Sequence, residues 1–331
     1  MPVTLAQANQ NAVTDLDVSV IDEFRKSDLL EAMVFDDAVN PVGGGATLTY
    51  GYRRKITTGS AAFRAINAEY TPAEVSTQQY NTTLKPLGGS FQVDRVLAKV
   101  GPAASGAISL QLADKIEATK RKFGDAVING DSATDVNGFD GLSKALVGSS
   151  TEDTTLVDLT GTRDQAWAFR VLDMVDDLLS LMDGDASMVF CNKRLLNIIR
   201  SAMRVSNQYT QVAGPRGQGT RMQYGTATFV DLGTKDGSTT DYTVSDVIPI
   251  NAADPDGAGP LVAGSTSIYA VRFGLDAFHG VSVAGGALVQ TWLPDFTVAG
   301  AVKTGEVELG PVAVALKRTK AAAVRRNIKV Q

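Results

Sequence analysis

The stretch FGDAVINGDSATDVNGFDGL, residues 123–142, contains side chains that could supply oxygen ligands to a metal. Four of them lie within ten consecutive positions. They are Asp131, Asp135, Asn137 and Asp140. An EF-hand calcium loop needs oxygen ligands at alternate positions, glycine at the sixth and glutamate at the twelfth. Counted from Asp131, these last two positions hold Val136 and Leu142, so the calcium pattern fails. We interpret the stretch as Asx-rich turns that follow the end of a helix.

The chain offers few residues for catalysis. His279 is its only histidine, and the surrounding DAFHGVSV matches no nucleophile or base motif, so we expect a satisfied structural histidine. Cys191, the only cysteine, follows the apolar residues MVF and is expected to be buried and inert. No glycine precedes a Lys-Ser or Lys-Thr pair at phosphate-loop spacing. Four acids have helical spacing, and most of them are expected to face solvent: Asp173, Asp176, Asp177 and Asp183. We predict no catalytic, metal or cofactor site.

The bulk composition is that of a folded globular protein. Of its 331 residues, 44% are hydrophobic and 20% are charged, and the net charge is −5. The first residues, MPVTLAQANQNAV, have neither the basic nor the apolar region of a secretory signal. No apolar run reaches the length of a membrane span. The expectation is a soluble cytoplasmic product that does not contact membranes.

Charge is segregated along the chain. Residues 38–68 contain no acid but carry four basic side chains, Arg53, Arg54, Lys55 and Arg64. Residues 150–186 hold nine acids and two arginines, whereas residues 192–230 hold six basic residues and no acid. Such blocks are typical either of solvated faces or of a subunit whose opposite patches meet on neighbouring copies.

Periodicity predicts helices over 13–34, 105–128, 162–182 and 193–204, the third opened by a capping box of Thr162 and Gln165. Leu48, Tyr50 and Tyr52 alternate at period two, as do Tyr80 and its neighbours. The sequence therefore predicts a long two-stranded excursion with a polar tip near residues 55–67. Because an isolated hairpin is marginal in water, we expect it to lie on another surface. The fold class is α+β.

Taken in order, these pieces resemble the major capsid proteins of tailed bacteriophages, which have the Hong Kong 97-type fold. In that family a spine helix ends near an I-x-G-(D/G) turn, and a G-(F/L)-x-G-L turn follows. Here the matching residues are Ile128, Gly130 and Asp131, then Gly138, Phe139, Gly141 and Leu142. The stretches TGTRDQAWAFRVLDMV, ASMVFCNKRLLNIIRSAM and QYGTATFVDL follow the succession of the family's axial domain.

The resemblance implies a division of the chain into an N-terminal arm, an extended loop, a peripheral domain and an axial domain. The arm would be residues 1–44 and the loop residues 45–90. The peripheral domain would comprise 91–149 and 286–331, including the spine helix 105–128, and the axial domain would be 150–285. Arg53, Arg54, Lys55 and Arg64 would contact a neighbouring subunit through the extended loop. Residues 123–142 would be a scaffold corner between the two domains.

The resemblance also implies a function and partners. The chain would form pentamers and hexamers of an icosahedral shell around double-stranded DNA, contacted only by non-specific proximity. It would assemble in the host bacterial cytoplasm and reside in the virion. A separate scaffolding protein, a portal and a decoration protein are the implied partners.

Some family members cross-link a loop lysine to an asparagine of the next subunit. Lys55 is the sole candidate here, but no partner asparagine or assisting glutamate is identifiable, and we predict no cross-link.

The principal alternative is an encapsulin, a nanocompartment shell of the same fold that encloses cargo enzymes. A tail-tube protein and a hydrolase with an unrecognised site are weaker alternatives. An encapsulin would carry a cargo-peptide pocket, and a hydrolase would lose activity on substitution of His279 or an aspartate. Fold alone does not decide between these functions.

Overall fold

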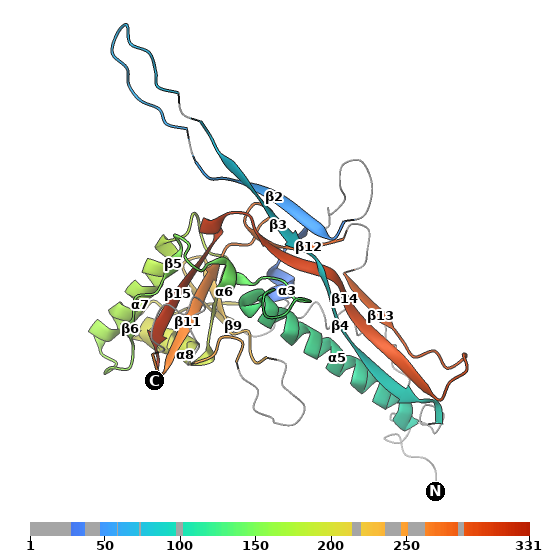
Figure 1. Cartoon of the computed structure of the whole chain (residues 1–331). Coiled ribbons are helices and arrows are strands. Elements are labelled where there is room, and N and C mark those ends of the chain that lie inside the picture. Colours follow the sequence, from blue (N-terminus) through green and yellow to red (C-terminus); the bar gives the residue numbers. More distant parts are fainter. Residues whose placement is uncertain are drawn as a thin grey trace.

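The computed structural model describes residues 28–36, 47–57, 59–72, 74–96, 102–213, 220–235, 246–250, 262–283 and 288–331. A long helix, two β-sheets and a projecting two-stranded hairpin are the main parts (Figure 1). The fold is mixed α+β, as the sequence predicted.

The long helix α5 (Pro102–Asn129) confirms the helix predicted over residues 105–128. Four apolar side chains on one face are at most 2% exposed: Leu112, Ile116, Phe123 and Val127. Their spacing of four and seven residues keeps them in one stripe. This stripe packs on strands β4 (Lys85–Asp94) and β14 (Val302–Leu316).

Strand β14 is the centre of the five-stranded sheet. Along one edge it pairs antiparallel with β4, from Val302 opposite Asp94 to Val312 opposite Lys85. The other edge is shared by β12 (Phe278–Ser282) and β13 (Val289–Trp292). The short strand β1 (Phe35–Asp36) adds to β12 in parallel.

The projecting hairpin confirms the predicted excursion. Its strands, β2 (Thr49–Lys55) and β3 (Thr77–Thr83), pair antiparallel with Tyr52 opposite Tyr80. Only Leu84 separates β3 from β4, so the second strand of the hairpin runs directly into the five-stranded sheet. The described residues between the two strands form no helix or strand and extend far from the body of the molecule (Figure 1).

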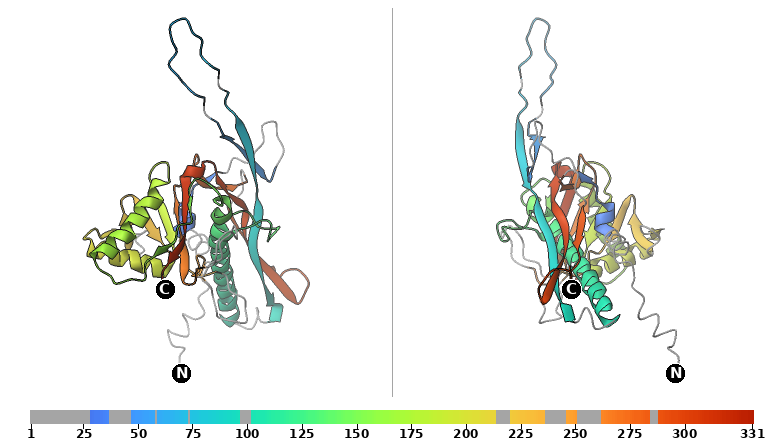
Figure 2. Two further views of the ribbon diagram at one scale, coloured as in Figure 1. Left: turned by 60° about the vertical axis from the view of Figure 1, so that its left-hand side comes forward. Right: turned by 90° about the vertical axis from the view of Figure 1, so that its right-hand side faces the viewer.

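The second sheet has eight strands and forms a separate layer with two helices. From one edge to the other, the strands follow the order β5 (Glu152–Asp153), β15 (Ala322–Lys329), β11 (Ser265–Val271), β7 (Met188–Cys191), β10 (Ala227–Val230), β9 (Thr220–Tyr224) and β8 (Thr210–Ala213). The eighth strand, β6 (Val157–Asp158), also pairs with β15. Helices α7 (Gln165–Ser180) and α8 (Lys193–Val205) lie on the side of this sheet away from α5 (Figure 2).

The start of α7 differs from the prediction. We expected a capping box of Thr162 and Gln165, but the N-cap is Asp164, whose carboxylate accepts the backbone N–H of Trp167 at 2.7 Å. Both are N-cap residue types, and the carboxylate also favours the positive end of the helix dipole. The helix therefore begins two residues later than the capping box implied.

Two strands cross the domain boundaries that the resemblance implied. We placed residues 286–331 in the peripheral domain, yet β15 pairs with β11 in the eight-stranded sheet. We placed residues 150–285 in the axial domain, yet β12 pairs with β14 in the five-stranded sheet. Only residues 317–321 separate β14 from β15, and the last three form a 3₁₀ turn (Thr319–Ala321), so the chain changes sheets there.

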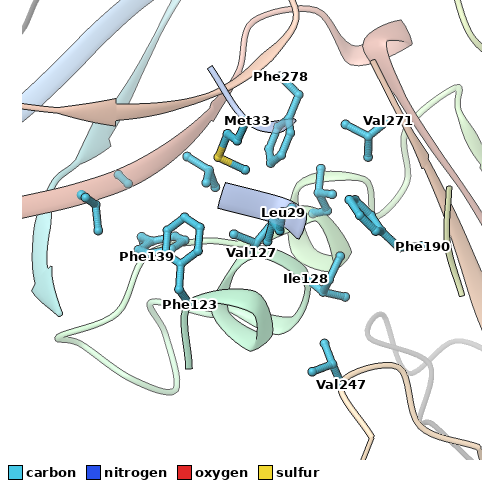
Figure 3. Close-up of a cluster of buried hydrophobic side chains, with 14 of the residues drawn as sticks. Leu29, Met33, Phe123, Val127, Ile128, Phe139, Phe190, Val247, Val271 and Phe278 are labelled. Atoms are coloured by element: carbon cyan, nitrogen blue, oxygen red, sulfur yellow. The ribbon is translucent and has the colours of Figure 1, made fainter. Parts of the chain in front are cut away.

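The core between α5 and the two sheets is aromatic and aliphatic. Figure 3 shows Phe123, Phe139, Phe190 and Phe278 around Leu29 and Met33. These last two residues belong to, or follow, the short helix α3 (Asp28–Ala32). It is the described end of the helix predicted over 13–34, whose earlier part lies outside the described residues.

The stretch 123–142 forms a corner at the end of α5. The backbone of Gly141 donates to the carbonyl of Gly130 at 2.8 Å, so the chain folds back on itself. Helix α6 (Leu142–Ala145) begins immediately afterwards, and its Lys144 ammonium binds the carboxylates of Asp131 and Asp140. The four oxygen-bearing residues therefore lie in turns, as interpreted from the sequence.

A buried arginine connects this corner to the eight-stranded sheet. Arg326 on β15 is 3% exposed and pairs with Glu152 at 2.5 Å. Its guanidinium also donates to the carbonyl and hydroxyl oxygens of Ser143 at 2.9 and 3.2 Å. A buried charge is tolerated only with such pairing, so the three residues fix one another's positions.

Substitution of Gly130 tests the corner. A Cβ at this position would stand 2.3 Å from the Phe139 carbonyl oxygen and 2.4 Å from that of Ala126. We expect Gly130→Ala to lower the free energy of unfolding by about 1 to 3 kcal/mol, because the backbone at Phe139 and Ala126 would have to move to admit the new methyl group. Gly124→Ala, inside α5, is the control: its Cβ meets nothing within 4 Å, and stability should rise by up to about 1 kcal/mol. Urea denaturation of both variants measures the difference, and equal stabilities would contradict the tight corner.

Candidate functional site

The four basic residues predicted to contact a neighbour all lie on the hairpin, but they do not share one environment. Arg53 and Lys55 point outward from β2 and are exposed. Arg54 lies between them on the opposite face and is half-buried. Arg64 lies farther out, in the irregular tip. The alternation of side chains along a strand separates Arg54 from its two neighbours.

Arg54 binds its own chain at the root of the hairpin. Its guanidinium donates to the backbone carbonyls of Leu316 and Lys317, the latter at 3.1 Å. It also lies 4.3 Å from the ring centroid of Tyr80 and 5.5 Å from that of Tyr52, within the range of cation–π attraction. These contacts occupy part of the Arg54 side chain within one chain, and its contact with another subunit stays a prediction.

The two tyrosines complete this clamp. The Tyr52 and Tyr80 rings stack with centroids 5.9 Å apart, and the Tyr52 hydroxyl donates to the Leu316 carbonyl at 3.0 Å. Burial raises the pKa of Tyr52, and the neighbouring Arg54 charge opposes that rise. Sequence reasoning found the period-two tyrosines but did not assign them to the root. The signal that could have found the clamp is that Tyr52 and Arg54 share one face of a strand.

A second contact at the root involves Tyr50. Its hydroxyl donates to Asp36 on β1 at 2.9 Å, and the Lys317 ammonium lies 5.4 Å from the ring centroid. Burial and the hydrogen bond to Asp36 together raise the pKa of Tyr50 well above its usual value. The hairpin is thus attached to β1, β12 and the end of β14.

His279 is buried beneath this contact. It is fully inaccessible to solvent, and its ring makes an edge contact with Tyr50 at 5.9 Å. Neither ring nitrogen has a hydrogen-bond partner of ordinary geometry among the described residues. The histidine therefore lies in a buried, structural position. Burial lowers its pKa and the Lys317 charge lowers it further, whereas Asp36, a backbone hydrogen bond with Ala277 and Asp276 act in the opposite direction.

The tip of the hairpin exposes large apolar side chains. Phe63 is fully exposed, Ile66 is 92% exposed and Tyr70 is 65% exposed. Arg64 lies 5.4 Å from the ring centroid of Tyr70 and donates to the Ala68 carbonyl at 3.0 Å. The Arg64 guanidinium is thus partly engaged by groups within the tip itself. The apolar tip residues were not among the predicted contacts, although they stand in the predicted excursion.

The remaining candidates for chemistry have structural surroundings. Cys191 is buried, and burial raises the pKa of its thiol far above the usual range. Asp177 pairs with Arg325 at 3.3 Å and Asp176 accepts from the Tyr224 hydroxyl, while Asp173 is exposed. The Lys144 hydrogen bond lowers the pKa of Asp131 to about 2.

A cavity of about 950 Å³ lies beside the corner at the end of α5. Charged side chains around it are largely paired with one another. Lys235 binds Asp125 at 3.3 Å, and Lys144 binds Asp131. Among the described residues that line the cavity, these pairs leave no convergent set of free groups that would point to a substrate or cofactor.

Comparisons with known proteins show the fold. No protein-family model and no curated protein sequence matches the chain. Among solved structures, the SrpI encapsulin complex of Synechococcus elongatus PCC 7942 is similar over 100% of this chain and 98% of the other, with 14% identity and a TM-score of 0.56. Mycobacterium phage Bobi matches over 91% and 90%, with 10% identity and a TM-score of 0.52. The capsid of a native GTA particle matches over 91% and 89%, with 12% identity and a TM-score of 0.51. The chain has the Hong Kong 97-type capsid fold that its sequence resembles.

Removal of the Arg54 side chain tests the clamp. We expect Arg54→Ala to weaken the attachment of the hairpin by about 1 to 3 kcal/mol, since hydrogen bonds from a charged donor are lost. Hydrogen exchange of residues 49–55 and 77–83 should become faster, with little change in the eight-stranded sheet. Arg53→Ala is the control, because its side chain is exposed one residue away. Equal protection of the hairpin in the two variants would contradict the clamp.

The buried histidine predicts a pH dependence of stability. The unfolded chain takes up a proton near the ordinary histidine pKa of about 6.5, whereas folded His279 resists protonation. Stability from this group is therefore complete above that pH and falls in acid, by up to about 1.4 kcal/mol per pH unit. Urea unfolding at several pH values between 7 and 5 measures the slope. Because His279 is the only histidine, His279→Leu should remove most of it in this range. An unchanged slope in the variant would assign the effect to other groups.

Proposed function

We propose that this chain is the major capsid protein of a tailed bacteriophage, which self-assembles into pentamers and hexamers of an icosahedral shell around the DNA genome. The observation that carries the proposal is the hairpin: it is anchored at its root and exposes Phe63, Ile66 and Tyr70 at its tip. Monomeric proteins rarely expose such a group of large apolar side chains. The Hong Kong 97-type fold supports a shell role by analogy.

Each part of the fold would have its own role in the shell. The arm and the extended loop (residues 45–90) reach neighbouring copies, and α5 with the five-stranded sheet forms the peripheral domain. The eight-stranded sheet with α7 and α8 forms the axial domain, whose edges meet around the symmetry axes. Closed symmetry then limits growth.

Assembly would proceed through many weak contacts. Burying one large apolar side chain of the tip contributes about 1.5 to 3 kcal/mol before the entropy of association is counted. Arg53 and Lys55 stay exposed beside the root and are free to meet acidic groups of a neighbour. We propose no enzymatic activity, no cofactor and no cross-link at Lys55.

The proposed partners are other copies of the chain, a scaffolding protein, a portal and a decoration protein. With a net charge of −5 the subunit has no overall attraction for DNA, so its contact with the packaged genome would be non-specific. The proposed location is the virion, after assembly in the host bacterial cytoplasm. No described helix has the length and apolar character needed to cross a membrane.

The second candidate is an encapsulin-type nanocompartment shell. Its specific support is the likeness to the SrpI encapsulin, which extends over 100% of this chain and 98% of that one. The two candidates share the fold and differ in what the shell contains.

Negative-stain electron microscopy of the purified chain tests both candidates. The chain would be expressed alone and together with a candidate scaffolding protein. We expect closed icosahedral shells, or rings of five and six. Nuclease-protected DNA in particles from infected cells supports the phage function, and enclosed cargo protein supports the encapsulin. A monodisperse monomer or dimer under all conditions would refute a shell function.

Polar substitution of the hairpin tip tests its role in assembly. We expect Phe63→Ser with Ile66→Ser to reduce particle yield at least tenfold, because the apolar contact with a neighbour is lost. Circular dichroism should be unchanged, since neither side chain is buried in its own subunit. The matched control is Val136→Ser with Leu156→Ser, two exposed apolar residues outside the hairpin. Normal yield from the tip variant would exclude the tip as an assembly contact.

A further inference from the structure

Helices α7 and α8 lie in the same outer layer of the molecule (Figure 2). Their exposed side chains differ in the sign of their charge. The outer face of α7 carries Asp173 and Asp176, both exposed. The outer face of α8 carries Lys193, Arg200 and Arg204, and no acid occurs between residues 192 and 230. The two helices contact each other through buried apolar residues, which leaves both charged faces open.

The spacing on the two helices is the same. Phe169, Asp173, Asp176 and Ser180 follow one another at intervals of four, three and four residues, and so do Lys193, Asn197, Arg200 and Arg204. Such intervals keep all four residues on one stripe of a helix, about 16 Å long. The acidic and basic stripes are therefore matched in length and opposite in sign.

The charges are not neutralised between the two helices. None of Lys193, Arg200 and Arg204 forms a salt bridge with another described residue, and no described salt bridge involves Asp173. The Arg200 Nε is buried and has no hydrogen-bond partner there. Arg170 is the exposed cation on α7 itself. Apart from Arg170, the exposed charges on each helix have one sign, although Asp176 also accepts the Tyr224 hydroxyl, and they fit a partner that carries the opposite sign.

The α7 face also carries an exposed apolar side chain. Phe169 on the α7 stripe is 48% exposed, and Val205 is 42% exposed at the end of α8, to the side of its basic stripe. An exposed aromatic residue surrounded by charges has the composition of a protein interface, in which the apolar side chain is buried and the rim is polar. The features point to a protein partner rather than to a small ion.

We propose that the α7 face of one copy docks on the α8 face of the next copy, with Asp173 and Asp176 opposite Arg200 and Arg204. The partner is a second copy because the same chain carries both members of the complementary pair. The two faces are different surfaces, so the contact is heterologous, and its repetition gives a ring when the rotation between copies closes, as in the proposed pentamers and hexamers. This inference rests on the proposed shell function and assigns the contact within its rings.

Charge reversal on each face tests the contact. The acidic face is reversed in Asp173→Lys with Asp176→Lys, and the basic face in Arg200→Glu with Arg204→Glu. We expect each double variant to reduce the yield of shells at least tenfold, because like charges then meet at every contact. The variant with all four substitutions should return to within about twofold of the wild-type yield. Its net charge is −5 + 4 − 4 = −5, that of the wild type, so net charge cannot explain the recovery.

Mixing the two double variants gives an independent readout. A reversed α7 face fits only a reversed α8 face, so the two kinds of subunit must alternate around a ring. Alternation is satisfied in a ring of six but not in a ring of five. We expect hexamers, sheets or tubes without closed icosahedral shells. A mixture that closes normal shells, or one that does not associate, would overturn the proposed contact.

The matched control is Asp114→Lys with Glu117→Lys, two exposed acids three residues apart on α5. It changes the net charge by the same amount as the α7 variant and should assemble normally. Circular dichroism and thermal unfolding establish that every variant is folded. Normal assembly of either double variant, failure of the folded four-substitution variant, or equal loss in the control overturns the inference. If the wild type itself forms no shells under any condition, the proposed function fails first, and that result is distinguishable from all of these.

Discussion

The pairing of β4 with β14 is the constraint on which the other parts of the molecule depend. Two strands alone are marginal in water, so a hairpin that projects from the body needs a fixed base. The structure supplies it by continuing β3 into β4, which pairs with β14 from Lys85 to Asp94. Gly88 makes the close approach feasible, because a Cβ there would stand 2.3 Å from the Val307 carbonyl oxygen. The same strand β14 supplies the Leu316 carbonyl that Arg54 and Tyr52 hold.

Position along a strand decides what a basic residue can do. Arg53 and Arg54 are adjacent and chemically identical, yet one faces solvent and the other is held between Tyr80 and the end of β14. The sequence analysis grouped Arg53 and Arg54 because both lie in a segment that has basic residues and no acid. The period of two, read together with Tyr50 and Tyr52, would have separated them. The partner carbonyls at 316 and 317 could not be predicted, because they lie more than 260 residues away in the chain.

Short-range sequence patterns predicted the elements that depend on interactions between residues close together in the chain. The apolar stripe of α5, the hairpin and the polar corner at Gly130 all follow from short-range periodicity and turn chemistry. The arrangement of the other elements depends on pairing between residues far apart in the chain. The strand 322–329 contains two arginines, yet Arg326 is buried against Glu152 and Ser143, and Val324 and Ile328 lie in the core. A buried ion pair between residues 174 positions apart leaves no mark on either local sequence.

A subunit that must associate faces opposite demands on its surface. Large apolar contacts would bind neighbours tightly but would also cause non-specific aggregation of the free chain. Here the exposed aromatic Phe63 stands at the end of a long hairpin, away from the body, while the outer layer of α7 and α8 is charged. Charges of opposite sign attract at a distance and penalise wrong contacts, but surface pairs are individually weak. A surface divided in this way can hold subunits in register while still allowing misplaced ones to leave before a closed assembly is complete.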